Sequence, residues 1–448
     1  GYFQYQGSLA KNAAPTASTL SLFFQVQDAE LAYQPGWPTL REGRGEVYIE
    51  DSGVRVELAE GRILNSRVSN AQALIATALP GQPIRLLLNS ELSSNVDDAL
   101  KILQDAPLGT AEIFAGWSGA GDLSGKLQLD LPLRKGLKPE VVVDFASSNG
   151  ELNLSNPLLQ LSQVQGAFRY DTARGLSAPD IRARVLGHAV RGKARAEGRD
   201  GRALTRIEAT GRVGVTELSA WLGVTQPLPL SGSLPYRLRL ALDGADSQLR
   251  VDSNLQGLAI ELPAPFGKAA GAASYADWRM TLSGAERRYW LDYAELASLS
   301  FAAPLGQFAE GRGELRLADG PASLPGGKGV RLRGRVAELD WDAWQAVLQP
   351  YKRLPSESAQ QLFNDAQLQI GRFSGFGTEL EALALRLQRV AQSWAVDLDS
   401  ERIKGRIDVA DDAAVPMALN LDYLRLPAAE PKPETSVAVD KPDPLAGV

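Results

Sequence analysis

The stretch Leu234-Pro235-Tyr236-Arg237-Leu238-Arg239-Leu240-Ala241-Leu242 has a large apolar residue at every second position. Successive side chains of a β-strand point to opposite faces, so the stretch predicts a strand with one aliphatic face and one face that carries guanidinium groups. The same alternation recurs along most of the chain, and turn residues such as Asp200-Gly201 and Asp243-Gly244 separate the runs.

These short strands predict a mainly β fold. Short connections require antiparallel neighbours, so we expect a long antiparallel meander with a few short helices. About 25 to 30 strands at roughly 4.8 Å spacing would make a sheet on the order of 120 to 140 Å long. A sheet of that size must twist and curl, and we expect it to curl into a hydrophobic trough; a sandwich is the alternative.

Helix starts are predicted at three places. Ser94 with Asp97 resembles a capping box, Thr216 precedes a segment that carries Trp221, and Asp340 precedes Trp341. The two glycine-rich segments at 119–125 and 326–329 lack the spacing of nucleotide-binding loops, and we expect both to be hairpin loops.

The chain also repeats itself. The pentapeptide EGRGE occurs at 42–46 and again at 310–314, and a looser third copy begins at Gly150. Residues 1–427 are therefore predicted to form one continuous repetitive β-groove, with related units that start near residues 28, 149 and 296. Residues 428–448 are rich in proline and acidic residues and are predicted to be a disordered linker.

The composition contains few of the residue types that catalytic sites use. The chain has no cysteine and a single histidine, His188, which lies in a predicted strand. The adjacent carboxylates Asp97-Asp98 and Asp411-Asp412 fit a helix start and a turn. The net charge of −6 comes without a basic block. We predict no enzyme, no cofactor, no metal and no nucleic-acid partner.

The aliphatic stripes allow two interpretations, because such faces usually form protein core and only sometimes line a ligand trough. For the trough, the predicted lining is Val47, Ile49, Leu127, Leu129, Leu131, Val141, Val143, Phe145, Phe168, Ile181, Val185, Tyr236, Leu238, Leu240, Leu242, Leu258, Ile260, Leu315, Leu317, Leu383, Leu385, Leu387, Leu419 and Leu421.

Four phrases of the sequence, at 28–38, 61–65, 262–268 and 421–427, resemble the AsmA-like superfamily and within it the YhdP-type envelope proteins. The resemblance covers most of residues 20 to 427. It implies a periplasmic part of a Gram-negative protein that is anchored in the inner membrane by a segment outside this chain. It also implies a non-enzymatic bridge that carries phospholipids along a β-sheet groove toward the outer membrane or its proteins.

A second function remains open at this point. The sheet edges could bind unfolded outer-membrane protein strands, which would make the chain an envelope assembly scaffold. A glycan-active solenoid that uses two distant carboxylates is a third hypothesis.

Overall fold

The computed structural model describes residues 1–8, 18–32, 35–76, 82–107, 110–134, 136–137, 139–155, 158–199, 202–224, 226–351, 363–390, 393–412 and 414–425. The predicted linker at 428–448 lies outside these residues.

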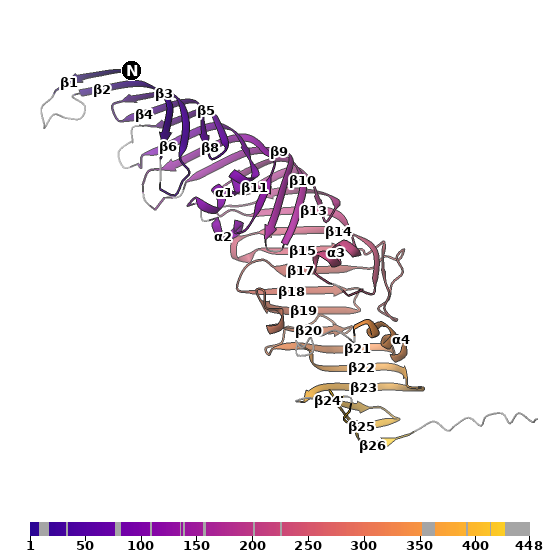
Figure 1. Cartoon of the computed structure of the whole chain (residues 1–448). Coiled ribbons are helices and arrows are strands. Elements are labelled where there is room, and N and C mark those ends of the chain that lie inside the picture. The colour runs from indigo at the N-terminus through magenta and orange to yellow at the C-terminus, as the bar shows by residue number, and fades with distance from the viewer. Residues whose placement is uncertain are drawn as a thin grey trace, which may run out of the picture.

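One mixed sheet contains all 26 strands of the described residues (Figure 1). Its first half comprises β1 (Tyr2–Gly7), β2 (Ser18–Leu31), β3 (Leu40–Glu50), β4 (Gly53–Ile63), β5 (Ser66–Ile75), β6 (Arg85–Asn95), β7 (Ser118–Ala120), β8 (Asp122–Pro132), β9 (Glu140–Ser155), β10 (Leu158–Asp171), β11 (Gly175–Val185), β12 (His188–Ala196) and β13 (Thr205–Gly214).

The second half comprises β14 (Leu230–Leu242), β15 (Gln248–Ser253), β16 (Leu258–Ile260), β17 (Ala276–Thr281), β18 (Glu286–Tyr293), β19 (Ala297–Pro304), β20 (Arg312–Leu317), β21 (Gly329–Asp340), β22 (Phe363–Gly375), β23 (Thr378–Val390), β24 (Ser393–Asp399), β25 (Ile403–Ala410) and β26 (Ala418–Leu424). Neighbours in the sheet are mostly neighbours in the chain, so β1 and β26 lie at opposite ends (Figure 1).

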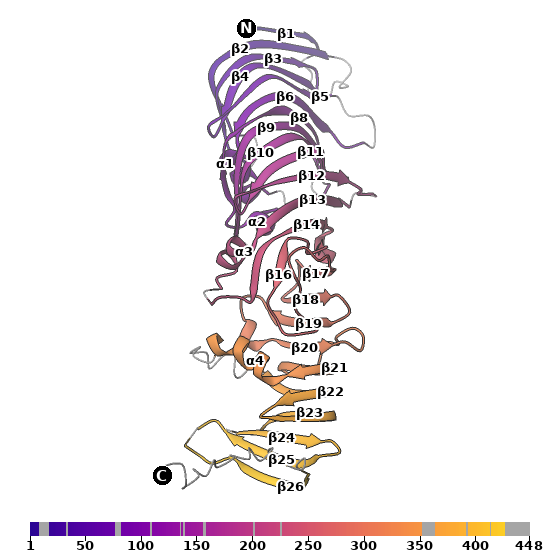
Figure 2. The same cartoon turned by 90° about the vertical axis from the view of Figure 1, so that its right-hand side faces the viewer.

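Helices are few and short. They are α1 (Val96–Asp105), α2 (Ala111–Phe114), α3 (Val215–Trp221) and α4 (Trp341–Leu348), with 3-10 turns η2 (Gly244–Asp246), η3 (Phe308–Glu310) and η4 (Gln349–Tyr351). Figure 2 shows α1, α3 and α4 along one edge of the molecule. These helices leave most of both sheet faces uncovered.

The sheet is a single curled layer. In Figure 2 the strands from β2 to β12 form arches, whereas those near the C-terminal end are flatter. All strand pairs of the described residues with substantial contact are ladder neighbours or next neighbours, so an open curled sheet forms and a sandwich does not. The predicted mainly β, curled architecture is confirmed.

The antiparallel expectation is wrong at one place. The pairs β20–β21 and β21–β22 are parallel. Residues 318–328 therefore form a crossover that returns to the starting side of β20. Gly326 and Gly327 belong to this crossover and Gly329 begins β21, so the glycine-rich segment is not a hairpin. The second crossover contains α4. At 119–125 there is no hairpin either, because β7 pairs with β9 while β8 pairs with both β6 and β9.

Two of the three predicted helix caps need correction. Asn95, and not Ser94, caps α1 by accepting a hydrogen bond from the backbone N–H of Asp98. The cap position of α3 is Gly214, so Thr216 lies inside the helix. Asp340 caps α4 as predicted and accepts from the N–H of Ala343.

Two hairpins 121 residues apart share their irregularities. Leu31 opposes Leu40 in β2–β3, as Leu152 opposes Leu161 in β9–β10, and both hairpins contain two register shifts. The equivalent residues Glu42 and Gln163 both have φ of 52°. The two EGRGE copies differ, because β3 continues into an antiparallel hairpin with β4 whereas β20 continues into the parallel crossover.

Candidate functional site

One face of the sheet is apolar from strand to strand. Directly opposed residues of paired strands point to the same face, so the register can be followed across the sheet. One such row, here called the apolar row, runs through Gly166, Ile181, Gly192, Ala209, Leu238, Val251, Trp278, Leu291, Leu299, Leu315, Leu332, Ala366, Leu387, Val396, Ile407 and Leu419. Every member is apolar or glycine.

The same face continues toward β2. Phe168 lies two residues from Gly166 and opposes Phe145, and the two rings stack at 5.0 Å. Val141 lies on β9, the strand of Phe145. From Val141 a second row of opposed residues runs toward β2 through Leu129, Leu88, Ala73, Val56, Val47 and Phe24. We call the surface formed by these rows and their same-face neighbours the apolar face.

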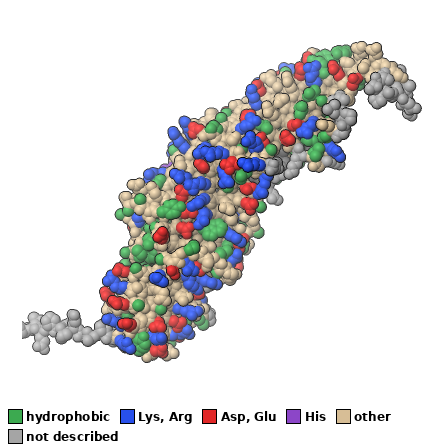
Figure 3. All heavy atoms as spheres, turned by 180° about the vertical axis from the view of Figure 1, so that it is seen from behind, with side chains coloured by type: hydrophobic (Ala, Val, Ile, Leu, Met, Phe, Trp, Pro, Cys, Tyr) green, Lys and Arg blue, Asp and Glu red, His purple; other side chains and the backbone are tan. Residues whose placement is uncertain are grey.

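From β10 to β26 the other face is polar at every position next to the apolar row. The row one residue away runs through Gln165, Arg182, Arg191, Thr210, Arg237, Asp252, Asp277, Asp292, Ser298, Arg316, Arg333, Gln367, Arg386, Asp397, Arg406 and Asn420. Viewed from behind, the molecule shows Lys and Arg beside Asp and Glu along its length (Figure 3). The sheet is therefore amphipathic from β10 to β26. Toward β2 the opposite face also carries apolar side chains, namely Phe23, Leu74 and Leu87.

Ion pairs hold this polar face together. Asp277 has a side chain only 3% exposed and lies 2.5 Å from Arg250 Nε and 3.0 Å from Arg279 Nε. Arg279 also contacts Asp292 at 2.8 Å. Because three aspartates stand side by side in the row, the neighbouring arginines are needed to offset their repulsion.

The structure places the predicted lining residues on this one face, with two exceptions. Leu258 and Ile260 lie on β16, which pairs with Leu230–Gly232 outside the main ladder. Most of the others are half-buried, whereas Leu242 and Leu419 are exposed and Leu383 is buried.

Sequence reasoning missed the lining contributed by β15 and β17 to β19. Val251, Trp278, Leu291 and Leu299 are members of the apolar row, and Tyr289 lies on the same face. The alternation Tyr289, Leu291, Tyr293 was a visible signal, but these strands are shorter and more aromatic than the leucine-rich stretches that suggested the trough.

Aromatic rings on the apolar face lie across glycines of neighbouring strands. A Cβ on Gly211 would be 2.7 Å from the Tyr236 hydroxyl, and one on Gly313 would be 2.8 Å from the Phe301 ring. Within β10, a Cβ on Gly166 would be 3.2 Å from the ring of Phe168 on the same strand. Since the rings occupy space that side chains would otherwise take, they stay close to the sheet.

Tyrosines on this face have desolvated hydroxyl groups. Burial raises the pKa of Tyr170 and Tyr236, and it is also the main cause of the raised pKa of Tyr289. These shifts favour the neutral phenol and indicate a low-polarity environment on the apolar face.

All the α-helices of the described residues lie at one rim, here called the helical rim, where β6, β13 and β21 end and α1, α3 and α4 begin. Asp98 of α1 is buried there and accepts hydrogen bonds from Asn65 N at 2.9 Å, Asn65 Nδ2 at 3.1 Å and Ser66 Oγ at 2.6 Å. Trp221 of α3 donates its indole N–H to the carbonyl of Leu158.

Residues 254–275, here called the flap, project from the same rim. Lys268 Nζ donates to the carbonyl oxygens of Leu258 at 2.8 Å, Ala269 at 2.9 Å and Ala272 at 2.5 Å, which ties the flap to itself. The flap reaches α4, where the rings of Phe266 and Trp344 meet at 5.9 Å. Tyr293 donates to the carbonyl of Phe266 at 3.1 Å, so the flap borders the apolar face.

The opposite rim carries the turns 51–52, 172–174, 243–247, 282–285 and 305–311. We call it the open rim, because it carries no α-helix in the described residues. The site is thus a continuous apolar surface with one built-up rim and one open rim.

Sequence comparison identifies the family behind this architecture. The matching family is described as YhdP protein, and the match spans residues 1–446. The chain belongs to the YhdP family. A search of curated proteins returned no match for this chain.

Membership of the YhdP family makes this a bacterial envelope protein, and the family is not known as an enzyme family. In the part of this YhdP-family chain that the structure describes, no helix is long and apolar enough to cross a membrane.

The candidate catalytic groups of this YhdP-family chain have structural partners. Asp97 pairs with Lys101 at 2.7 Å, and Asp411 forms a two-bond ion pair with Arg389. His188 Nε2 lies 3.9 Å from Glu217 Oε1 at the helical rim. The carboxylates therefore stabilise turns and helix ends.

Proposed function

We propose that the chain is a non-enzymatic conduit for phospholipids across the periplasm, between the inner and the outer membrane. Acyl chains lie on the apolar face while headgroups stay in water. The observation that carries the proposal is the apolar row, which crosses the ladder from Gly166 to Leu419 with no polar member. Family membership supports an envelope role of this kind.

Elementary energetics explains why continuity matters. Moving one methylene group from an apolar surface into water costs about 0.8 kcal/mol. A tail of some sixteen carbons would therefore meet a barrier on the order of 10 kcal/mol at a wide polar gap. On a continuous apolar face, an acyl chain that moves along the sheet exchanges one apolar contact for another at each step.

The open rim is the side on which we place the headgroups. The helical rim is occupied by α1, α3, α4 and the flap, whereas the described part of the open rim consists of turns. Membrane attachment at the inner membrane, through a segment outside this chain, and delivery to the outer membrane or its proteins belong to the same proposal.

One substitution pair tests the conduit. Leu238→Asp puts a carboxylate into the apolar row, while Thr210→Asp puts the same carboxylate on the polar face of the adjacent strand, opposite Arg191 and Arg237. We expect Leu238→Asp to lower copurified phospholipid, measured by mass spectrometry, and to slow lipid delivery to the outer membrane at least tenfold, since it desolvates an unpaired charge next to a bound tail.

Thr210→Asp should leave both quantities unchanged. Circular dichroism and thermal unfolding establish that both variants fold. Normal lipid content and delivery in a folded Leu238→Asp protein would refute the conduit.

The scaffold hypothesis rests on the two outer strands of the ladder. Among the described residues, β1 pairs with β2 alone and β26 with β25 alone, and unpaired strand edges bind extended peptides. If proline substitutions in β26 removed a copurified polypeptide, and Leu238→Asp had no effect on lipid, the scaffold would replace the conduit.

A further inference from the structure

A phenylalanine from the open rim forms a second layer on the apolar face. Phe308 lies in η3, within the loop 305–311, and is 59% exposed. Its ring is parallel to that of Phe301, with 10° between the planes and 6.3 Å between centroids. It also contacts the ring of Tyr289 at 5.8 Å.

The two rings that Phe308 contacts belong to the apolar face. Tyr289 opposes Met280 and Phe301, and Phe301 opposes Gly313, so all are on the apolar face. The Phe301 ring lies over Gly311 and Gly313, where an added Cβ would be 2.2 and 2.8 Å from the ring. Phe308 therefore contacts a part of the apolar face that β18, β19 and β20 form without it.

The loop around Phe308 is fixed at its ends. Leu305 N donates to Ala285 O at 3.2 Å, and Arg312 binds Glu286 with two hydrogen bonds of 2.8 and 3.1 Å. Between these points Gly306 has φ of +74°, a conformation that glycine adopts without strain. Within the loop, Gly311 N donates to the carbonyl of Phe308 at 3.0 Å, and Glu310 pairs with Lys328 at 2.8 Å. The backbone can thus stay in place while the exposed Phe308 side chain turns.

The opposite rim is also occupied at this level of the sheet. The flap contacts Tyr293 of β18, the strand that carries Tyr289. The apolar face is therefore bordered by Phe266 and its neighbours on the helical rim and by Phe308 on the open rim.

We propose that Phe308 is a gate that occupies the position of a passing acyl chain above Tyr289 and Phe301. Its phenyl ring covers the apolar floor when no lipid is there, and a tail that crosses β18–β20 displaces the ring outward through the open rim. This proposal rests on the conduit function and adds a residue that controls its rate.

Displacement can be observed directly. In the complete protein, 4-fluorophenylalanine at position 308 reports the ring stack by fluorine NMR, and a photoreactive residue at position 238 reports bound lipid. With vesicles of phosphatidylethanolamine and phosphatidylglycerol, we expect crosslinking at 238 and a shift of the 308 signal toward its position in a Tyr289→Ala, Phe301→Leu protein.

Phe376 supplies a matched control. It is an exposed loop phenylalanine whose ring stacks on Trp341 at 5.9 Å, at the helical rim. A fluorine label at 376 should not respond to lipid. Phe308→Ala should speed lipid passage about two- to tenfold, the range of one aromatic pair, whereas Phe376→Ala should leave the rate unchanged.

The outcomes separate the two proposals. Lipid crosslinked at 238 with an unmoved 308 signal, or with equal rates in Phe308→Ala and wild type, overturns the gate and leaves the conduit. Absence of crosslinking at 238 overturns the conduit and the gate with it.

Discussion

At the scale of single residues, the apolar face depends on pairs of a glycine and an aromatic residue on adjacent strands. Tyr236 lies over Gly211, and its burial raises the pKa of its hydroxyl group. The glycine leaves room for the ring beside the sheet, so the tyrosine adds apolar area without filling the groove.

Gly211→Val tests this arrangement. The new side chain would begin 2.7 Å from the Tyr236 hydroxyl, so the ring must leave the floor. We expect copurified phospholipid to fall at least severalfold. Adding Tyr236→Ala should restore it, and Gly271→Val, where a Cβ meets nothing within 4 Å, should have no effect. A normal lipid content in folded Gly211→Val would contradict the role of the pair.

Alternation in the sequence predicts which side chains share a face, because the strand period is two. It therefore predicts that Tyr236, Leu238 and Leu240 share one face of their own strand. It could not pair Gly211 with Tyr236, because a cross-strand partner depends on the register and not on the local sequence. For the same reason the sequence does not predict the contact between the rings of Phe308 and Phe301.

At the scale of elements, α1 is attached to the sheet through Asp98. Burial of Asp98 opposes its ionisation, but hydrogen bonds with Ser66, Asn65 and the cap residue Asn95 outweigh burial and lower its pKa. The carboxylate therefore joins the helix to the β4–β5 turn.

Asp98→Ala should destabilise the protein by about 2–4 kcal/mol, since it leaves buried donors unpaired. The adjacent Asp97→Ala removes only an exposed pair with Lys101 and should cost about 0.5 kcal/mol or less. Hydrogen exchange of α1 and thermal unfolding measure both effects. Equal effects of the two substitutions would show that Asp98 does not anchor the helix.

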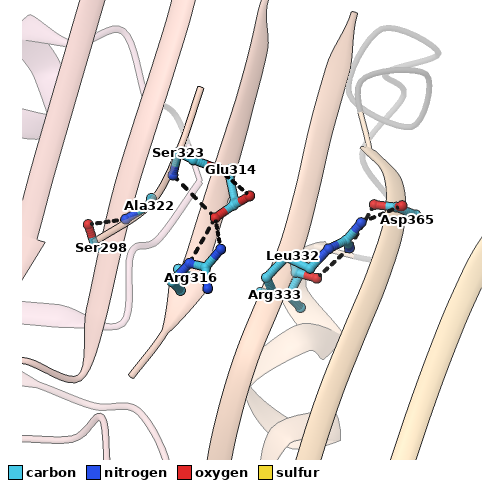
Figure 4. Close-up of polar contacts among 8 residues, drawn as sticks. All are labelled: Ser298, Glu314, Arg316, Ala322, Ser323, Leu332, Arg333 and Asp365. Atoms are coloured by element: carbon cyan, nitrogen blue, oxygen red, sulfur yellow. Dashed lines mark hydrogen bonds and ion pairs between the residues drawn. The ribbon is translucent and has the colours of Figure 1, made fainter. Parts of the chain in front are cut away.

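The crossover 318–328 is held on the polar face by Glu314. Ser323 donates to Glu314 through its N–H at 3.2 Å and its hydroxyl at 3.0 Å, and Ala322 N donates to Ser298 Oγ at 3.0 Å (Figure 4). Burial of Glu314 opposes ionisation, but the bonds from Arg316 and Ser323 outweigh it and lower the pKa below the ordinary 4.5.

This shift predicts an acid-sensitive crossover. A carboxylate with a lower pKa in the folded state contributes its stability above the unfolded value and loses it as the pH falls through the folded value. Hydrogen exchange at 320–325, corrected for the intrinsic rate, should therefore rise as the pH drops below 4.5. In Glu314→Gln it should be higher at neutral pH and no longer depend on acid; acid-insensitive exchange in the wild type would contradict this.

The crossover also marks the limit of turn prediction. Asp319-Gly320 and Gly326-Gly327 have the composition of tight turns, and turns are what the sequence suggests. Whether the following strand runs back antiparallel or crosses over depends on the docking of β21 beside β20 and on Glu314, which lies outside the segment itself.

At the scale of the whole molecule, the chain is one amphipathic layer. Buried clusters are small, such as Leu58 with Val68 and Ala71 near one end and Leu368 with Ile370 and Leu383 near the other. The curled architecture could be foreseen from composition and alternation, because so many strands cannot stay flat and so few helices cannot cover them. The extent of the apolar row could not be predicted from the sequence. Each register shift changes which residues of a strand point to the apolar face, and the register is set by the neighbouring strand.

The nearly sequential strand order has a consequence for how this sheet assembles. Each antiparallel strand docks on the strand made just before it, so the growing edge is always the template for the next segment, as in the one-dimensional folding of repeat proteins. The parallel strands β21 and β22 can pair only after the segment 318–328 and the segment with α4 have crossed back to the other rim. Closing these loops costs conformational entropy before any strand pairing compensates for it. We therefore expect the strands on either side of β20–β22 to pair locally first, and the two parts of the sheet to join last at the parallel strands.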